Sequence, residues 1–224
     1  MNFDGIASEY DAWYQTPLGA YANRLEKKLI FELAEQKSGE TVLDIGCGTG
    51  NYSIELAHMR LEVVGIDPSG NMLKIAREKA EKEGLDIKFI LGTAESLPFN
   101  DDVFDLVVLV TTFEFLDPKK AIFEMRRVLK WDGRIIVGVL NRWSVWAFER
   151  RIKSLFEKTI FAGARFYSIP ELKRFFGKVR WKTTLFAPPH TPSFLLKYFE
   201  RLEGALSRVF KPFGAFIGVR IEHA

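Results

Sequence analysis

The sequence predicts an α/β fold built on a seven-stranded, mostly parallel, doubly wound sheet with an antiparallel final strand. Helices are expected on both faces of the sheet, together with a helical lid. Two observations predict this fold. Short apolar runs alternate with longer segments of helical periodicity through the middle of the chain, and a glycine-rich loop follows the first apolar run. Strands separated by helices of that length usually form a parallel sheet, because a parallel connection needs a crossover.

Five of the expected strands lie in the first 140 residues, at 41–47, 61–67, 86–92, 104–111 and 134–140. The fourth, FDLVVLVT, is apolar at nearly every position, as expected of a strand buried on both faces. Helices are expected at 51–60, 70–84 and 117–130, with a turn at 131–133. Ser69 and Asp117 are predicted N-cap residues, and Pro118 suits the first helical position.

The two ends of the chain follow a different pattern. A helix is expected at 20–36, before the first strand. After the fifth strand, the sequence predicts an amphipathic helix at 142–160 and a short helix at 168–177. A strand at 179–187, a helix at 193–210 and a final strand at 214–222 complete the expected sheet.

The composition indicates a globular domain with a substantial core, since 47% of the 224 residues are hydrophobic. No apolar stretch approaches the roughly 18 residues that a membrane-spanning helix needs. The first residues, MNFDGIASEYDAWY, lack the basic and apolar regions of a signal peptide. The single cysteine excludes an internal disulfide, and with three scattered histidines it leaves no metal cluster. We therefore expect a cytoplasmic protein without a metal site.

The loop after the first expected strand carries the main functional signal. It reads VLDIGCGTGNYS and holds Gly46, Gly48 and Gly50. A dinucleotide fingerprint would need Gly or Ala where Asn51 stands, and the Gly-Lys-Ser/Thr of a phosphate-binding loop is absent. The carboxylate of Asp44 beside this loop would repel a pyrophosphate and attract a cation.

A second acid, Asp67, ends the second expected strand in EVVGIDPS. An acid at that position can accept both ribose hydroxyls of a nucleoside. The pattern therefore predicts a ligand with a ribose, no phosphates and a positive charge near Asp44. S-adenosyl-L-methionine meets all three demands through its ribose, its sulfonium and its amino group.

Three segments occur in order: VLDIGCGTG, VVGIDPSGNML and GTAESLPFNDDVFDLVV. Together they resemble the Rossmann-like class I S-adenosylmethionine-dependent methyltransferases, and most of all the small-molecule branch with the ubiquinone and menaquinone methyltransferases. The resemblance covers about residues 40–140, and FDGIASEYDAWY resembles the segment before the core in that branch. Residues 142–211 resemble no segment of a known family. The resemblance implies S-adenosyl-L-methionine as cofactor and S-adenosyl-L-homocysteine as its product.

The resemblance also implies which residues bind the cofactor. Thr93 stands where the family commonly has Asp, and Glu95 is a candidate to replace that carboxylate. The implied residues are Asp44, Gly46, Cys47, Gly48 and Gly50 at the methionyl part, Asp67 and Pro68 at the ribose, Met72, Thr93, Ala94 and Glu95 at the adenine, and Val110 and Thr111 again near the methionyl part.

Methyl transfer requires mainly that the protein align the nucleophile, exclude water and in some cases remove a proton. The sequence does not identify a catalytic residue, but it offers three candidates: His190 after the sixth strand, Tyr14 in the N-terminal segment and Glu114 after the fourth strand. For Tyr14 simple packing, and for Glu114 a solvated loop position, remain open. Enzymes of this class that methylate nucleobase or glutamine amino groups carry Asn/Asp-Pro-Pro-Tyr/Phe after the fourth strand. This chain has VTTFEF, which disfavours that chemistry.

A basic, aromatic segment follows the core. Between Arg142 and Lys211 there are 15 Lys or Arg and 5 Asp or Glu, a net charge of +10 in a chain whose net charge is +3. The helical pattern over 142–160 is expected to place six apolar side chains largely on one side, with basic residues flanking them. The apolar ones are Trp143, Trp146, Phe148, Ile152, Leu155 and Phe156, and the basic ones are Arg150, Arg151, Lys153 and Lys158.

Two interpretations of this segment remain open. It can be a lid whose apolar face covers the pocket, or a helix that rests on an anionic membrane surface and admits a lipid-like substrate. Nucleic acid is disfavoured because the overall charge is small. The sequence does not indicate an oligomeric state.

We expect a single domain over residues 1–224, since no repeat, low-complexity tract or flexible linker interrupts the chain. Within it, 1–38 forms an N-terminal helical cover, 40–141 the cofactor-binding core, 142–168 an inserted lid and 169–224 the C-terminal part of the sheet. The expected function is methyl transfer from S-adenosyl-L-methionine to a small-molecule or lipid-like acceptor. A non-catalytic scaffold or sensor that binds S-adenosyl-L-methionine remains the alternative.

Overall fold

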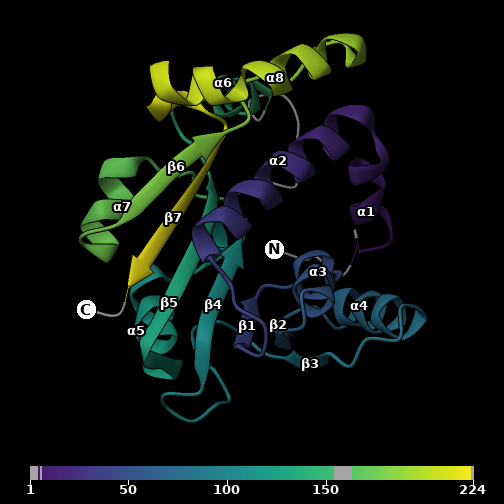
Figure 1. Ribbon diagram of the computed structural model, residues 1–224, viewed down its shortest axis with the longest axis vertical. Helices are drawn as coiled ribbons and strands as arrows, with labels where there is room; N and C mark the ends of the chain where they lie inside the picture. Colours follow the sequence, from purple (N-terminus) through teal and green to yellow (C-terminus); the bar gives the residue numbers. More distant parts are fainter. Residues whose placement is uncertain (1–4, 6, 154–162, 223–224) are drawn as a thin grey trace.

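A computed structural model describes residue 5, residues 7–153 and residues 163–222 of the chain. A seven-stranded sheet lies at its centre, with the strand order β3-β2-β1-β4-β5-β7-β6 (Figure 1). The strands are β1 (Thr41–Ile45), β2 (Glu62–Asp67), β3 (Lys88–Leu91), β4 (Phe104–Val110), β5 (Leu129–Leu140), β6 (Arg180–Thr184) and β7 (Phe216–Glu222).

Strands β3, β2, β1, β4 and β5 pair in parallel, whereas β7 pairs antiparallel with both β5 and β6. The predicted mostly parallel sheet with an antiparallel final strand is therefore confirmed. The strand order reverses between β1 and β4, which are neighbours in the sheet although two strands separate them along the chain. Sheets of this type bind their ligands in the crevice at such a reversal, beyond the carboxyl ends of the strands.

Within the described residues, eight α-helices and two 3₁₀ turns surround the sheet. They are α1 (Ala7–Gln15), α2 (Pro17–Ala34), α3 (Asn51–His58), α4 (Gly70–Lys82), α5 (Pro118–Val128), α6 (Val145–Lys153), α7 (Ile169–Phe176) and α8 (Ser193–Val209), with η2 (Phe113–Phe115) and η3 (Lys211–Phe213). The two predicted N-caps are confirmed. The Ser69 hydroxyl accepts from the Met72 N–H at 3.1 Å, and the Asp117 carboxylate accepts from the Lys119 N–H at 3.0 Å.

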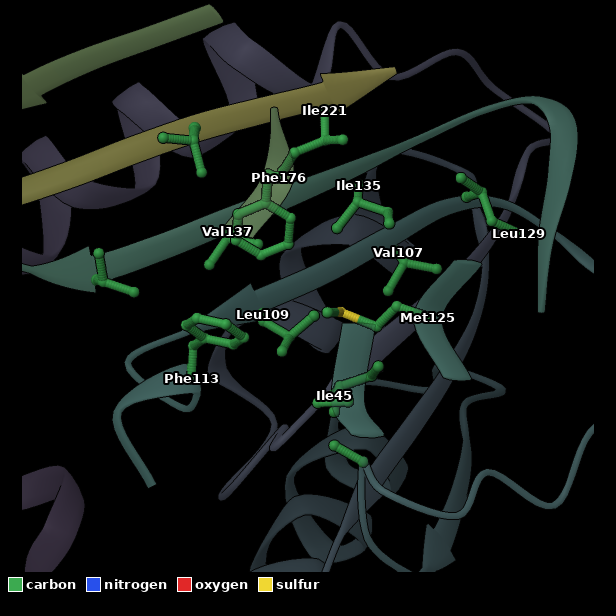
Figure 2. Packing of buried hydrophobic residues seen from close by; sticks show 14 of the residues in the cluster. Ile45, Val107, Leu109, Phe113, Met125, Leu129, Ile135, Val137, Phe176 and Ile221 are labelled. Atoms are coloured by element: carbon green, nitrogen blue, oxygen red, sulfur yellow. The ribbon is translucent and has the colours of Figure 1, made fainter. Parts of the chain in front are cut away.

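The core lies on both faces of the sheet, because successive residues of a strand point to opposite sides. On one face, Ile45, Val107 and Leu109 meet Met125 of α5 and Phe176 of α7 (Figure 2). On the other face, residues from β1, β4 and β5 pack against α2 and α3. This second cluster includes Leu29, Ile30, Leu33, Val42, Leu56, Leu106, Val108 and Ile136.

Several expected element boundaries differ in the structure. The N-terminal helix α2 begins at Pro17, because Thr16 caps it by accepting from the Gly19 N–H at 3.0 Å. The expected turn at 131–133 lies inside β5, which begins at Leu129. Pairing of Leu129 with Phe104 extends the ladder to that point, and the register shifts before Leu106, so the turn residues form an irregular part of the strand.

The expected helix over 142–160 begins at Val145, since the Ser144 hydroxyl accepts from the Ala147 N–H at 3.0 Å. Trp146 is 7% exposed, whereas Phe148 is 65% exposed. The expectation that these two side chains share one side of the helix is therefore wrong, because residues two apart lie about 200° apart around a helix. Residues Leu155, Phe156 and Lys158 lie outside the described residues. Within the described part of the chain, no helix combines the length and the apolar character needed to cross a membrane.

Candidate functional site

A cavity of about 450 Å³ lies where the strand order reverses, beyond the carboxyl ends of β1, β2 and β4. Its walls come from the loops that follow these strands and β3, from helix α1 and from the 3₁₀ turn η2. The lining residues are Tyr10, Ile45, Gly46, Gly48, Ile66, Asp67, Pro68, Met72, Gly92, Thr93, Ala94, Glu95, Val110, Thr111, Thr112, Phe115, Leu116 and Gly163.

The loop after β1 needs glycine for two different reasons. Gly46 has φ +69°, and a Cβ at this position would lie 2.2 Å from the Thr112 Oγ1. Gly48 has φ +54°, but a Cβ there would meet no atom within 4 Å. Since Gly48 lines the cavity, a side chain at this position would occupy ligand space. The loop therefore exposes its backbone to whatever binds there.

Asp67 lies at the centre of the site, at the end of β2. Its Oδ2 accepts from the Gly48 N–H at 2.9 Å and its Oδ1 accepts from the Ser69 N–H at 2.8 Å. The carboxylate thereby fixes the β1 and β2 loops relative to each other. Because an ionised carboxylate offers about four acceptor positions, it can still accept from the hydroxyls of a ribose.

Three of the predicted cofactor residues are not among those that line the cavity: Asp44, Cys47 and Gly50. Asp44 is buried behind the loop, where its Oδ2 accepts from the Ser53 hydroxyl at 2.6 Å. Burial, with the nearby charge of Asp67, raises the pKa of Asp44 to about 6, although the Ser53 hydroxyl partly counteracts the shift. The Asp44 side chain thus bonds to α3.

Cys47 and Gly50 also have structural surroundings. The Cys47 side chain packs in an apolar cluster with Leu73, Ala76 and Phe89, and burial raises the pKa of its thiol well above the usual range. A thiol of this kind is a poor nucleophile. Gly50, with φ +80°, starts α3, and a Cβ there would lie 3.1 Å from the Ala76 Cβ.

The opposite wall contains the remaining predicted residues. Pro68, Met72, Thr93, Ala94 and Glu95 line the cavity on the side of β2 and β3. Val110 and Thr111 line it at the end of β4.

Thr111 has φ +50°, which is unusual for a β-branched residue, while its N–H donates to the Gly138 carbonyl at 2.8 Å. Backbone strain of this kind is concentrated at functional sites.

Helix α1 is held against the glycine loop by a single carboxylate. Asp11 Oδ1 accepts from the Thr49 hydroxyl at 2.7 Å and from the Asn51 amide at 3.0 Å. Its Oδ2 pairs with the Lys79 ammonium at 3.1 Å. The neighbouring Tyr10 lines the cavity, so these contacts keep one of its walls in position.

The three catalytic candidates occupy different places. His190 lies at the surface, and its Nε2 lies 2.8 Å from Glu149 Oε1 on α6. Tyr14 is half-buried, with its hydroxyl 3.3 Å from that of Tyr10. Glu114 is 3% exposed. None of the three candidates lines the cavity, but Tyr14 contacts the lining residue Tyr10 and Glu114 directly precedes the lining residue Phe115, whereas His190 is exposed.

Two charged residues, Glu26 and Arg150, were not predicted from the sequence as residues of the site. Glu26 on α2 is 8% exposed, and burial raises its pKa to about 8 even though the charge of Arg150 on α6 opposes the shift. Glu26 could have been found, because it interrupts the apolar side of α2 between Ala22 and Ile30 at helical spacing. No comparable pattern singles out Arg150 among the basic residues of α6.

A family described as "Methyltransferase domain" matches residues 43–137. A demethylmenaquinone methyltransferase of Thermotoga maritima is 36% identical over 160 residues, which are 70% of this chain and 68% of that relative. A demethylmenaquinone methyltransferase of Thermus thermophilus is 38% identical over 138 residues, 60% of this chain and 62% of the relative. An uncharacterized methyltransferase of Bacillus subtilis is 38% identical over 111 residues, 49% and 44% of the two chains.

A solved structure covers nearly the whole length. It is a SAM-dependent methyltransferase of Thermotoga maritima, described as a possible histamine N-methyltransferase, with 29% identity and a TM-score of 0.76 over 99% of this chain and 98% of that one. The fold, the cavity and these relatives show that the chain belongs to the class I S-adenosylmethionine-dependent methyltransferases. The chain spans less than two thirds of the length of the Bacillus and Thermus relatives.

S-adenosyl-L-methionine is the cofactor of this class, and the residues present fit it. The cavity of about 450 Å³ is in the range of small-ligand sites. Gly48 leaves open space where a Cβ would stand, and Asp67 presents a carboxylate to the cavity. The buried Asp44 adds negative charge beneath the loop, which suits a sulfonium ligand.

Proposed function

We propose that this protein transfers the methyl group of S-adenosyl-L-methionine to a small-molecule or lipid-like acceptor. The observation that supports it most is the cavity, which joins an exposed glycine backbone, the Asp67 carboxylate and the strained end of β4 in one site. The bound cofactor supplies a methyl carbon activated by its sulfonium. The protein has to align the acceptor with that carbon and exclude water.

The cofactor roles follow the placement of the side chains. In the proposal, Asp67 holds the ribose, Met72 and Ala94 meet the adenine, and Gly46 and Gly48 admit the methionyl part. Tyr10 of α1 lines the cavity, and in the proposal this helix lies between the cofactor and solvent. We further propose that α6 belongs to a lid over the acceptor and that the protein works in the cytoplasm.

The relatives suggest two kinds of acceptor. Two of them are named demethylmenaquinone methyltransferases, which supports a quinone-like, lipid-soluble molecule. The solved structure described as a possible histamine N-methyltransferase supports a small amine and covers more of the chain.

The test combines binding with turnover. Calorimetry with S-adenosyl-L-methionine and S-adenosyl-L-homocysteine should give binding that Asp67→Ala removes, while Asp132→Asn, an exposed acid at the start of β5, should bind normally. Tritiated-methyl transfer into a cell extract should then label a low-molecular-weight product. No binding of either nucleoside would refute the proposal. Binding without any labelled product would favour the scaffold or sensor instead.

We also propose that the lid region, including residues 142–160, contacts an anionic membrane surface. Helix α8 supports this contact, because Phe194, Tyr198, Leu202 and Val209 are 67%, 48%, 54% and 74% exposed and share one side of the helix. The exposed Lys197, Arg201 and Arg208 flank this apolar stripe. Figure 1 shows α6 and α8 at the same end of the molecule.

An apolar stripe beside basic residues is typical of helices that lie in the membrane interface. Cosedimentation with vesicles containing phosphatidylglycerol should therefore detect binding at low salt. A variant with Phe194 and Leu202 changed to serine should lose it, whereas the same changes should leave cofactor affinity intact. Absence of wild-type binding at low salt would contradict this contact.

A further inference from the structure

A buried polar cluster lies beside the cofactor cavity. It consists of Glu26 from α2, Glu114 from the turn after β4 and Arg150 from α6. Glu26 and Glu114 are 8% and 3% exposed, and Arg150 is half-buried. Glu114 Oε1 accepts from the Leu140 N–H at 2.7 Å, whereas its Oε2 is buried without a hydrogen-bond partner. A buried carboxylate oxygen in that state needs a ligand, a water molecule or a proton.

Two residues that line the cavity, Tyr10 and Thr111, connect it to the cluster, although none of the three cluster residues lines the cavity itself. Tyr10 lines the cavity, its hydroxyl lies 3.3 Å from that of Tyr14, and the charge of Glu26 acts on both phenols. Thr111 lines the cavity at the end of β4, three residues before Glu114. The cluster therefore adjoins the part of the cavity assigned above to the methionyl group, where the methyl group must leave the cofactor.

The cluster has more negative than positive groups. Two carboxyl groups face one guanidinium, whose charge acts on both. Burial nevertheless dominates: it raises the pKa of Glu26 to about 8 and that of Glu114 to about 7. Fully ionised, the two carboxylates leave one more negative than positive charge among these three described residues.

We infer that this cluster is the acceptor site and that the acceptor is an amine, which enters as an ammonium ion and gives its proton to Glu114. The inference rests on the proposed methyltransferase function and narrows its acceptor. Glu26 pairs with the ammonium group. The positive charge of Arg150 offsets part of the repulsion between the two carboxylates. The faces of Tyr10 and Tyr14 suit a cation, because aromatic rings attract positive charge.

The reaction balances without a further reactant. Glu114 Oε2 takes one proton from the ammonium nitrogen, which then holds a free lone pair. That lone pair attacks the methyl carbon, the carbon–sulfur bond breaks, and its electron pair stays on sulfur to give neutral S-adenosyl-L-homocysteine. The product is an N-methylammonium ion, and Glu114 later releases its proton to solvent.

The negative charges of the cluster disfavour a quinol as the acceptor. A phenol or quinol becomes a good nucleophile by losing a proton, and the resulting anion would lie beside Glu26 and Glu114. Repulsion between like charges is strong where water is excluded. An amine passes from a cation to a neutral molecule and never meets that penalty.

The first test compares acceptors that differ in the reacting group. Purified protein with S-adenosyl-L-methionine is given phenethylamine, tryptamine and histamine, and in parallel phenol, hydroquinone and menadiol, with release of S-adenosyl-L-homocysteine as the readout. We expect turnover with at least one amine and none with the hydroxyl compounds. Turnover of a hydroxyl compound without any amine, or no turnover of any amine, overturns the inference. Cofactor binding by calorimetry is unaffected by either result and tests the proposed function separately.

The second test uses the best amine of the first. Glu114→Gln should lower kcat about 100-fold, the usual minimum for loss of a general base. It should also remove the rise of kcat with pH near 7, because that rise follows ionisation of Glu114. Glu26→Gln should mainly raise the KM of the amine. The affinity for S-adenosyl-L-methionine should change less than about twofold in both variants.

The matched control is Glu78→Gln, an exposed acid on α4, which should behave as wild type. The pH profile separates a proton acceptor from a structural residue. The groups around Glu114 that titrate or carry charge are Glu26 from α2, Arg150 from α6, Tyr167 before α7, and Tyr10, Tyr14 and Tyr52 beyond Glu26 from α1 and α3. A Glu114→Gln variant that keeps the wild-type rise of kcat with pH would refute the assignment.

Discussion

Replacing Asp11 by alanine should weaken the binding of S-adenosyl-L-methionine by up to about 30-fold. Asp11 is the only residue of α1 whose carboxylate is described bonding to the glycine loop, through Thr49 and Asn51, and it also pairs with Lys79 of α4. Removing it frees α1, which carries Tyr10 in the cavity wall. The cofactor must then order this helix when it binds.

The magnitude follows from the three contacts. The Thr49 hydroxyl donates from a residue that is 1% exposed, so its hydrogen bond to a charged acceptor is the most valuable of the three. The Asn51 and Lys79 contacts are half-exposed and contribute less, since solvent screens them. Together they are worth about 2 kcal/mol, which corresponds to a factor of about 30 in the dissociation constant. This is an upper limit, because packing of α1 on α2 remains.

Calorimetry with S-adenosyl-L-homocysteine measures the effect, with Asp132→Ala as the exposed-acid control. The pKa of Asp11 lies below its usual value. Burial alone would raise this pKa, but the contacts with Thr49, Asn51 and Lys79 together lower it by more than burial raises it. A carboxyl group whose pKa is lower in the folded than in the unfolded protein stabilises the fold fully at pH values above its unfolded pKa. This contribution is lost as the pH falls from the unfolded pKa through the folded pKa. The ratio of mutant to wild-type dissociation constants should therefore be constant between about pH 5 and pH 8. An Asp11→Ala variant that binds within twofold of wild type would refute the role assigned to α1.

Three further predictions concern the cofactor site and the neighbouring Glu114. Asp67→Ala removes the acceptor for the Gly48 and Ser69 N–H groups, and should weaken cofactor binding at least about 100-fold, since two hydrogen bonds to a charged group are lost with the ribose contact; calorimetry measures it. Gly46→Ala should lower the free energy of unfolding by about 3 kcal/mol in a denaturant titration, because the position combines a positive φ with a Cβ 2.2 Å from the Thr112 hydroxyl oxygen. Gly48→Ala should lower it by only about 1 kcal/mol but should reduce cofactor affinity more than Gly46→Ala does. Equal losses of stability in the two variants would contradict this. Burial raises the pKa of Glu114 from 4.5 to about 7, so ionisation of this group destabilises the folded state as the pH rises through that interval. Between about pH 4 and pH 8, the free energy of unfolding of Glu114→Gln should therefore rise by about 3 kcal/mol relative to that of the wild type. A difference independent of pH would show that ionisation of Glu114 does not destabilise the fold.

Much of the sheet and of the cofactor cavity could be predicted because their signals are local. Ser69 and Asp117 cap the helices that follow β2 and precede β5, as their positions before helical segments indicate. Asp67 and the glycines at 46 and 48 lie where a strand ends, and parallel strands bring such ends together at one edge.

Features set by distant contacts could not be predicted in this way. Helix α1 is held by packing on α2 and by Asp11, whose partners lie about forty and seventy positions away in the chain. The Asp44 carboxylate, predicted to lie at the methionyl part of the cofactor, accepts from the Ser53 hydroxyl of α3. The opposite exposure of Trp146 and Phe148 depends on the Trp146 indole donating to the Ala187 carbonyl at 2.8 Å, a contact with the loop after β6.

The division between local and distant signals has a functional consequence. The groups assigned to the cofactor follow β1 to β4, where the sequence resembles its relatives, and their positions depend on the sheet. Of the groups assigned to the acceptor, Glu26 and Arg150 come from α2 and α6, outside the region that the family matches. Only Glu114 lies inside that region, three residues after a strand end. Relatives that share the cofactor loops can therefore differ at Glu26 and Arg150, and under the proposal made above the charge of the acceptor site, rather than the sheet, determines whether an amine or a quinol is methylated.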